Sequence, residues 1–238
     1  MTSGVLPAQA LRQLIAQGAL AATPAIRDDQ LQPASLDLRL GPVAYRVRAS
    51  FLAGHGRTVQ ERLDEFTMHE VRLDGGAVLE KNCVYVIPLA ERLALPHGVT
   101  AVANAKSSSG RLDLLTRTIT DGGTEFDRIP DAYTGPLYAE VCPRSFSVLV
   151  REGQRLNQIR FRRGQAVLTD AELTALHAAE PLVSGEAVIS EGLGFSVDLK
   201  PAKGTLVGYR AKPHTGLVDL DRIGHYPASD FWEELHSR

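Results

Sequence analysis

Residues 106–111, the serine segment, combine hydroxyl groups, a glycine and two cations, a composition that could hold a polyphosphate. The segment consists of Lys106, Ser107, Ser108, Ser109, Gly110 and Arg111. Successive backbone N–H groups in a turn can form a nest for an anion, and an arginine can bind a phosphate through two parallel hydrogen bonds. The segment is not a Walker loop, because Ala105 stands where the second glycine of that motif would be. Composition alone leaves a solvated polar turn open as the alternative.

Glu140 is a second candidate, an acidic residue in an otherwise apolar stretch. The sequence PLYAEV, residues 136–141, predicts a strand on which Glu140 shares one face with Tyr138. Burial there would disfavour the ionised carboxylate and suit it to general acid and base chemistry. The alternatives are an ion pair with Arg144 or Arg160, or a place at a solvent-exposed rim.

The histidines and cysteines show no metal-binding spacing. Seven histidines lie singly along the chain, and none forms the H-x-E and P-C-x-x-C pattern of zinc deaminases. Cys83 and Cys142 are far apart, which predicts two reduced, largely buried thiols. The zinc deaminase pattern is therefore absent, and a structural or surface role is expected for each histidine.

The composition is that of an ordinary globular protein. Of the 238 residues, 44% are hydrophobic and 23% are charged, which suits one large domain or one and a half ordinary ones. A formal net charge of −2 argues against broad affinity for nucleic acid or anionic membranes. No apolar run approaches a membrane span, and the N-terminal residues lack the pattern of a signal peptide. We expect a cytoplasmic protein that binds neither nucleic acid nor membrane.

The elements that must position these residues are predicted to be mainly β. A helix is expected first, from about Pro7 to Gly18, because leucines and an isoleucine recur there at helical spacing. Short runs with alternating apolar residues follow, namely SLDLRL, VAYRVRA, HEVRLDG, CVYVIPLA, PLYAEV, SVLVREG and IRFRRG. Glycine, proline, asparagine or aspartate separate them, which is typical of antiparallel strands in a barrel or sandwich. The strands do not alternate with helices, so a Rossmann or P-loop architecture is not expected.

A second, incomplete repeat is expected at residues 166–238, after a β-rich unit at residues 1–165. LRQLIAQGAL and PASLDLRL near the N-terminus are echoed by ELTALHAAEPLV and GFSVDLKP. The echo predicts a helix and a first strand that start again near Thr169. The remaining residues are too few for a second β-rich body, so this part is either the start of a longer repeat or an appendage packed on the first unit. Trp232, the single tryptophan, is expected in a core or at an interface.

Four ordered motifs resemble the dCTP deaminase branch of the dUTPase-like family. The sequence PASLDLRLG, residues 33–41, is similar to the family's first strand. The serine segment matches the family's phosphate-binding element, with two serines followed by Arg111. Glu140 follows a turn at Gly135, as the family's catalytic glutamate does, and EGQRLNQIRF is a looser match to the closing strand.

The resemblance implies a distorted dUTPase-like antiparallel β-barrel with a short N-terminal helix and a partial second repeat. It also implies hydrolytic deamination of dCTP to dUTP and ammonia, in the supply of pyrimidine deoxynucleotides, with dUTP or dTTP as further ligands. Mg²⁺ would accompany the triphosphate, and no zinc would be needed. Because members of the family are normally trimers with sites shared between subunits, a homo-oligomer is expected, either a trimer or a pseudo-trimer.

The resemblance assigns roles to individual residues. Glu140 would deprotonate a water that attacks C4 of cytosine, and would then pass protons to N3 and the leaving ammonia. The serine segment would hold the triphosphate, and Arg111 would also order the surroundings of Glu140. The nucleoside would contact Thr120, Asp131 and Tyr133, with the tyrosine ring stacked on the deoxyribose.

The chain departs from the family pattern just before the glutamate strand. In IPDAYTG, Pro130 stands where relatives carry an aspartate that contacts the sugar, and the inserted residues DGGTEF lengthen the preceding loop. A long subgroup of the family fuses two units, and the resemblance implies that the second unit completes the site. Two other functions stay open on the same fold, a dUTP diphosphatase, which directs water to the α-phosphate, and a non-catalytic nucleotide-binding module.

Overall fold

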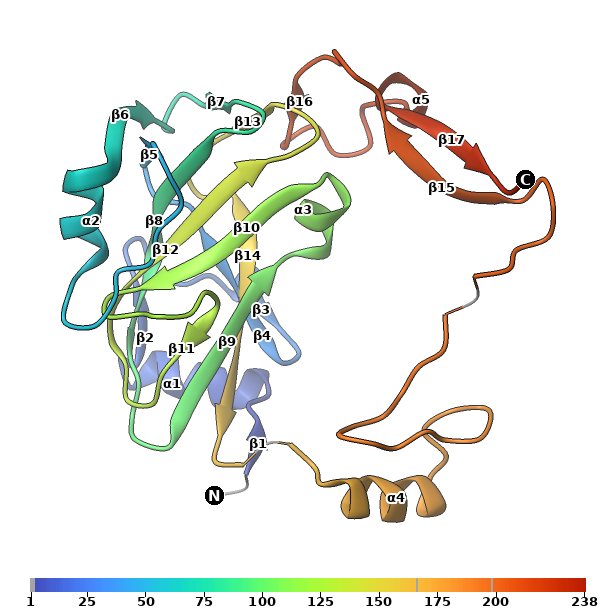
Figure 1. The fold of residues 1–238 in the computed structure, drawn as a ribbon. Coiled ribbons are helices and arrows are strands. Elements are labelled where there is room, and N and C mark those ends of the chain that lie inside the picture. Colours follow the sequence, from blue (N-terminus) through green and yellow to red (C-terminus); the bar gives the residue numbers. More distant parts are fainter. Residues whose placement is uncertain (1–2, 166, 198) are drawn as a thin grey trace.

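Alternating apolar residues along short strands fold the first part of the chain into two antiparallel sheets that close into a distorted barrel (Figure 1). The computed structural model describes residues 3–165, 167–197 and 199–238. An arm formed by residues 167–238 leaves the barrel and returns to it at a distant point (Figure 1). The predicted mainly β fold is therefore confirmed.

The first sheet has the strand order β11–β9–β14–β4–β3, with β1 added beside β14. All of its strand pairs are antiparallel. A single 3₁₀ turn, η1, precedes β3. The elements are β1 (Gly4–Val5), η1 (Asp28–Gln30), β3 (Leu31–Gln32), β4 (Ser35–Arg39), β9 (Val99–Ala105), β11 (Arg128–Ile129) and β14 (Arg155–Arg163).

The second sheet carries the predicted glutamate strand next to its edge strand. Its order is β10–β12–β8–β5–β6, with β2 beside β8. The strands are β2 (Leu20–Ala22), β5 (Val43–Val47), β6 (Thr67–Arg72), β8 (Val84–Ala94), β10 (Leu114–Thr120) and β12 (Thr134–Pro143). The register of β10 and β12 places Arg117 directly opposite Glu140.

Two hydrophobic clusters lie on opposite faces of the second sheet. The larger cluster fills the space between the two sheets and includes Leu137 and Ala139 of β12. The smaller cluster lies on the outer face, where helix α2 (Val59–Phe66) packs, and includes Tyr138 of β12 and Ile119 of β10. Because successive residues of a strand point to opposite faces, Glu140 belongs to the outer face that Tyr138 occupies.

The predicted N-terminal helix is confirmed as α1 (Ala8–Ala16). Its residues Leu11 and Leu14, one turn apart on the same face, are buried in the larger cluster. The helix ends before Gly18, whose backbone φ of +74° lies in the left-handed region that favours glycine after a helix. The chain then turns into β2.

Helix α2 is an element that the strand analysis does not predict. Its start has a capping box: the Thr58 side chain accepts a hydrogen bond from the Glu61 N–H, and the Glu61 carboxylate accepts one from the Thr58 N–H. The sequence TVQE carries this signal, so a search for helix caps would have found the helix. None of the helices in the described part of the chain is long and apolar enough to cross a membrane.

The end of the arm packs on the barrel through a third small sheet. Strand β16 (Val218–Asp219) runs parallel to β13 (Val148–Val150), which also pairs with β7 (Ala77–Leu79). The ring of Phe146 then contacts Phe231, at 5.3 Å between ring centroids, and Trp232, at 4.9 Å. The expectation that Trp232 packs in a core is therefore confirmed. Phe231 ends the short helix α5 (Ala228–Phe231).

The rest of the arm holds one predicted helix but lacks the predicted strand. Helix α4 (Asp170–Ala179) begins at Thr169, as the repeat suggests. The residues of GFSVDLKP other than position 198, which lies outside the described residues, form no strand, so the prediction of a repeated first strand is wrong. The reason is the missing partner: β4 is hydrogen-bonded between β3 and β14, whereas Phe195 and Leu199 are 77% and 83% exposed.

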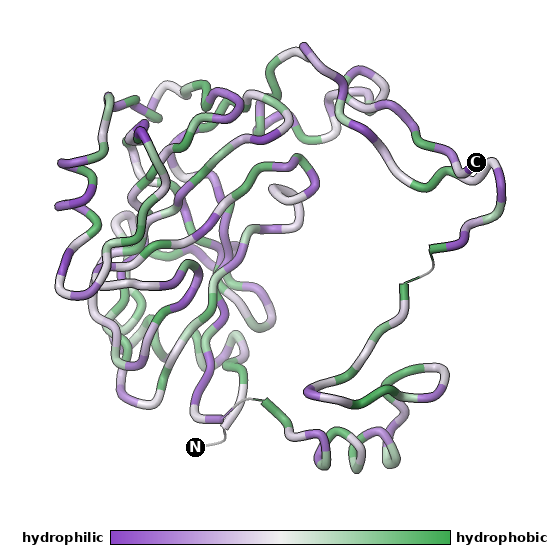
Figure 2. Tube along the Cα trace, in the orientation of Figure 1, coloured by the Kyte–Doolittle hydropathy of each residue, from purple (hydrophilic) through white to green (hydrophobic). Residues whose placement is uncertain are grey.

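The two last strands form a separate ribbon. Strand β15 (Leu206–Ala211) pairs with β17 (Trp232–His236) and with no other strand among the described residues. Figure 2 shows hydrophobic stretches along the arm as well as within the barrel. Among the described residues, those of the arm that pack on the hydrophobic core of the first unit lie between residues 211 and 232, around β16 and α5.

Acid is expected to release the end of the arm. Hydrogen bonds from Arg151 hold the pKa of Asp219 below its ordinary value of 3.8. A lowered carboxyl pKa contributes stability that is present above about pH 3.8 and lost as the pH falls below it. We predict that Trp232 fluorescence changes little between pH 7 and pH 5 and shifts toward that of an exposed indole below pH 3.8. In Arg151→Met the shift in Trp232 fluorescence should already be present at pH 7. An emission spectrum of this variant at pH 7 like that of the unsubstituted protein would contradict the proposed role of the Arg151–Asp219 pair.

Candidate active site

The serine segment forms a short helix, α3 (Ser107–Arg111), rather than the predicted turn. The Gly110 N–H donates to the Lys106 carbonyl at 3.0 Å, a helical hydrogen bond. The Ser109 hydroxyl donates to the Leu156 carbonyl at 3.1 Å and so fixes the helix to β14. The predicted turn is therefore wrong in conformation, because a tertiary hydrogen bond holds these residues in helical form, and the predicted binding of phosphate stays a prediction.

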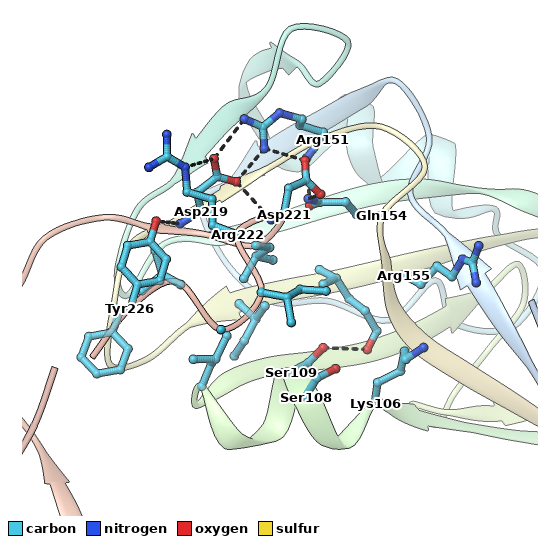
Figure 3. Close-up of a pocket in the computed structure, with 18 of the residues that line it drawn as sticks. Lys106, Ser108, Ser109, Arg151, Gln154, Arg155, Asp219, Asp221, Arg222 and Tyr226 are labelled. Atoms are coloured by element: carbon cyan, nitrogen blue, oxygen red, sulfur yellow. Dashed lines mark hydrogen bonds and ion pairs between the residues drawn. The ribbon is translucent and has the colours of Figure 1, made fainter. Parts of the chain in front are cut away.

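Helix α3 lies at one wall of a cavity of about 900 Å³ between the barrel and the end of the arm. Figure 3 shows Lys106, Ser108 and Ser109 on one side and the arm residues Asp219 and Tyr226 on the other. Aliphatic and aromatic side chains also line the cavity, among them Leu112, Leu114, Leu156, Phe231 and Trp232. Seven of the ten predicted site residues are not among its lining residues, namely Ser107, Gly110, Arg111, Thr120, Asp131, Tyr133 and Glu140.

The cations that face this cavity already have partners. The Lys106 ammonium group pairs with the buried carboxylate of Asp37. The guanidinium of Arg155 donates to the Asp29 carboxylate at 2.5 Å. In contrast, Arg111 is exposed and makes no hydrogen bond or ion pair with any residue that the structure describes. Of the cations in the serine segment, Arg111 is therefore the one whose charge is available to a ligand.

Glu140 is buried within β12, so the alternative of a place at a solvent-exposed rim is wrong. The residue is 2% exposed, and its Oε1 accepts hydrogen bonds from the Arg117 guanidinium, with Nε at 3.2 Å. Its Oε2 is also buried and has no hydrogen-bond partner among the described residues. The ion-pair partner is Arg117, so the alternatives of pairing with Arg144 or Arg160 are wrong.

Arg117 is a functional candidate that the sequence analysis missed. The alternation of LLTRTIT indicates a strand, but only the register with β12 shows that Arg117 meets Glu140.

Glu140 and α3 lie on opposite sides of the second sheet. The side chains of Glu140 and Arg117 are on the outer face, where Phe126 packs on the smaller cluster. Helix α3 is on the inner side, where Leu112 packs on the larger cluster and Ser109 bonds to β14. One chain therefore presents the glutamate and the serine segment to two different places.

Two of the three predicted nucleoside contacts lie near each other, because the Tyr133 hydroxyl accepts a hydrogen bond at 3.2 Å from the N–H of Asp121, the residue after Thr120. Thr120 is 1% exposed on the inner face of β10, and Tyr133 is 8% exposed in the larger cluster. Asp131 is on the surface, where its Oδ1 accepts a hydrogen bond from the Gly98 N–H at 2.7 Å. The role of these three residues in binding the nucleoside stays a prediction.

Tyr133 is expected to stabilise the fold through its hydroxyl group. The hydroxyl donates to the Pro136 carbonyl at 2.7 Å and accepts from the Asp121 N–H at 3.2 Å, and burial raises the pKa of Tyr133 to about 12. We predict that Tyr133→Phe lowers the free energy of unfolding by about 1–2 kcal/mol, since two buried backbone groups lose their partner. Urea unfolding measures this loss. A spectroscopic pH titration in which every tyrosine ionises near pH 10 would contradict the burial of this hydroxyl.

Metal-binding geometry is not evident in the described residues. No group of three or more histidine, cysteine, aspartate or glutamate side chains in residues 3–165, 167–197 and 199–238 could hold a metal ion. Both cysteines are free, Cys142 buried and Cys83 partly exposed. The prediction of chemistry without zinc stays a prediction.

The comparisons with known proteins agree on one family. Residues 2–165 match the family model described as the 2'-deoxycytidine 5'-triphosphate deaminase (DCD) N-terminal domain, and residues 169–238 match that of the DCD C-terminal domain. The crystal structure of 2'-deoxycytidine 5'-triphosphate deaminase from Agrobacterium tumefaciens is 51% identical to this chain, with a TM-score of 0.92. The match covers 100% of this chain and 72% of that chain.

Two dUTPase structures are similar only over a part of the chain. A dUTPase of EIAV is 18% identical, and the match covers 39% of this chain and 72% of that chain. A dUTPase of Staphylococcus bacteriophage 80alpha is 16% identical, and the match covers 39% of this chain and 68% of that chain. Both have a TM-score of 0.31, which is too low to support an argument. The comparison with curated proteins found no match. On the two family models and the Agrobacterium structure, the chain belongs to the 2'-deoxycytidine 5'-triphosphate deaminase family.

Proposed function

We propose that this chain catalyses the hydrolytic deamination of dCTP to dUTP and ammonia, with Glu140 as the general base and acid. The assignment of Glu140 rests on one observation. Its carboxylate is buried, and one of the two oxygens, Oε2, has no hydrogen-bond partner among the described residues. A buried acceptor without a partner is uncommon and calls for a ligand or a water. Membership of the deaminase family supports the reaction.

The reaction needs one group that both accepts and donates protons. Water adds to C4 of the cytosine ring while Glu140 takes one of its protons and passes it to N3. The second proton then moves from the new hydroxyl group through the same carboxylate to the exocyclic nitrogen. The C4–N bond breaks, ammonia leaves, and a C4 carbonyl remains. A carboxylate within hydrogen-bond reach of the water can do both transfers without any other ionisable group.

Mg²⁺ is proposed to enter as part of the substrate, bound to the triphosphate of dCTP. The support is chemical: a magnesium ion commonly keeps several waters and binds through phosphate oxygens. Arg111 is proposed to neutralise phosphate charge, because it is exposed and makes no ion pair within the described chain. The activity is expected to survive removal of trace zinc by a zinc-selective chelator and to fall when Mg²⁺ is omitted. A cytoplasmic location is also proposed, supported by the two free thiols.

The site is proposed to be completed by a second copy of the unit, as in a homo-oligomer. The support is the separation within one chain, where Glu140 is on the outer face of the second sheet and α3 on its inner side. A glutamate from one copy and a serine segment from another could then face the same nucleotide. Two inactive variants, Glu140→Gln and Arg111→Ala, test this when they are unfolded together and refolded as mixed oligomers. Shared sites predict that the mixture regains part of the deaminase activity, and no regain would contradict sharing.

The function itself is tested with two nucleotides and two products. Protein is mixed with Mg²⁺ and either dCTP or dUTP, and ammonia and pyrophosphate are measured. Ammonia from dCTP supports the proposal, whereas pyrophosphate from dUTP would indicate a diphosphatase. Tight nucleotide binding without either product would indicate a non-catalytic module.

A further inference from the structure

The guanidinium of Arg117 joins three separate elements beside Glu140. It donates from Nε to Oε1 of Glu140 at 3.2 Å, and a second nitrogen contacts the same oxygen. It also donates to the Ser50 hydroxyl at 3.2 Å, in the loop after β5. Its central carbon lies 3.7 Å from the centre of the Phe126 ring. A guanidinium held on three sides has little freedom to move.

Arg117 binds only one of the two oxygens of the Glu140 carboxylate. An arginine can bind both oxygens of a carboxylate in parallel, yet here the contacts of Arg117 go to Oε1 alone. The other oxygen, Oε2, is buried and has no partner among the described residues. The pair therefore fixes the plane of the carboxylate while one oxygen stays open to a water or a substrate proton.

The third contact comes from the inserted loop, residues 121–126. This loop is tied to the chain around α2: the Gly54 N–H donates to the Gly123 carbonyl at 2.9 Å, and the Gly122 N–H donates to the Arg57 carbonyl at 2.8 Å. A Cβ atom at Gly123 would lie 2.6 Å from the Thr120 hydroxyl, so glycine is needed at this close approach. The loop is thus held firmly where its last residue, Phe126, meets the guanidinium.

We infer that Arg117 is a positioning residue that orients the carboxylate of Glu140. The inserted loop holds the guanidinium of Arg117 in place through Phe126. The inference rests on the proposed function, because it deepens the role of the same glutamate. Arg117 keeps Oε2 aimed at the attacking water and need not touch the nucleotide. A ring face beside a guanidinium stabilises it by roughly 0.5–2 kcal/mol, which favours the orientation seen here.

The test uses steady-state kinetics of the full chain with dCTP. Arg117→Lys keeps the charge but loses the two-nitrogen contact, and its kcat is expected to fall about tenfold, since small misplacements at a reacting group cost one to two orders of magnitude. Arg117→Gln loses the charge as well, and its kcat should fall about a hundredfold. Phe126→Leu should lower kcat about fivefold, and KM for dCTP should stay within about threefold in all three variants.

Arg48 provides the matched control. Its guanidinium lies 4.9 Å from the centre of the Phe66 ring, a second arginine–phenylalanine pair on the same outer cluster without Glu140. Arg48→Lys and Arg48→Gln should leave kcat unchanged. Equal losses in the Arg48 and Arg117 variants would overturn the inference, as would a large rise in KM with kcat unchanged, which would make Arg117 a substrate contact.

Two outcomes separate the inference from the function on which it rests. If the unsubstituted chain releases ammonia from dCTP but Arg117→Lys and Phe126→Leu match it in kcat, the positioning role is wrong and the function stands. If the unsubstituted chain releases no ammonia, the proposed function is wrong and the positioning role falls with it. Should Arg117→Gln fail to give a folded protein by circular dichroism, Phe126→Leu alone decides, since it leaves the ion pair of Arg117 and Glu140 intact.

Discussion

Replacement of Glu140 by glutamine is expected to abolish deamination while leaving nucleotide binding nearly intact. The amide has the size of the carboxylate and can still accept a hydrogen bond from Arg117, so the local packing is preserved. It cannot take a proton from water at neutral pH, and general acid and base catalysis is commonly worth about 10²–10⁴ in rate. We therefore predict a loss of kcat of at least about a thousandfold, with dCTP affinity within about tenfold, or 1.4 kcal/mol.

Asp127 gives a control for this substitution in the same neighbourhood. Burial raises the pKa of Asp127, and its Oδ1 accepts a hydrogen bond from the Thr118 N–H at 2.7 Å. A raised carboxyl pKa means that folding favours the protonated form, so this group contributes stability at low pH that is lost as the pH rises above about 3.8. Asp127→Asn keeps the hydrogen-bond acceptor, so its free energy of unfolding at pH 7 should not fall. Its kcat should fall by less than threefold.

A Glu140→Gln protein that releases ammonia at the normal rate would show that the acid and base group is elsewhere.

Individual strands were predictable because the alternation of apolar residues that indicates a strand lies within the strand's own sequence. Alternation in SLDLRL and CVYVIPLA needs no knowledge of the rest of the chain, and β4 and β8 lie where these runs predict them. GFSVDLKP has a comparable pattern, but its described residues form no strand, because a strand is stable only when its backbone groups find a partner. Pattern alone cannot show whether that partner exists.

The candidate site was predictable in residue type but not in pairing. The acidic residue within an apolar strand marked Glu140, which is buried, and its catalytic role stays a prediction. Its partner depends on the register of β10 against β12, and a shift by one residue would turn Arg117 to the other face. The serine segment was predicted as a turn because its composition suits one, whereas the hydrogen bond from Ser109 to Leu156 depends on a strand far along the chain.

The buried ion pair of Arg39 and Glu91 is expected to have the largest effect on stability. The two side chains are 5% and 1% exposed, and Arg39 donates to Glu91 from both its side chain and its backbone N–H at 2.8 Å. Gln30 donates to the same carboxylate at 2.8 Å. Glu91→Leu leaves the guanidinium buried without its counter-charge, and breaking one side of such a pair commonly costs about 3–5 kcal/mol. We predict a loss of that size in the free energy of unfolding by urea.

The double variant separates two contributions to the free energy of unfolding: the cost of leaving Arg39 buried without its counter-charge, and the net contribution of the ion pair. Arg39→Met with Glu91→Leu removes both charges and replaces them with apolar groups of similar length, so most of the loss in Glu91→Leu should be recovered. Glu65→Leu is the exposed control: Glu65 pairs with Arg57 at the surface, where the side chains are 41% and 36% exposed, and the change should stay within about 1 kcal/mol. A double variant no more stable than Glu91→Leu alone would mean that the carboxylate stabilises the barrel through Gln30 and the β4 backbone rather than by balancing Arg39. The same outcome would make the hydrogen bonds, and not the charge, the reason that β4 and β8 are joined at this point.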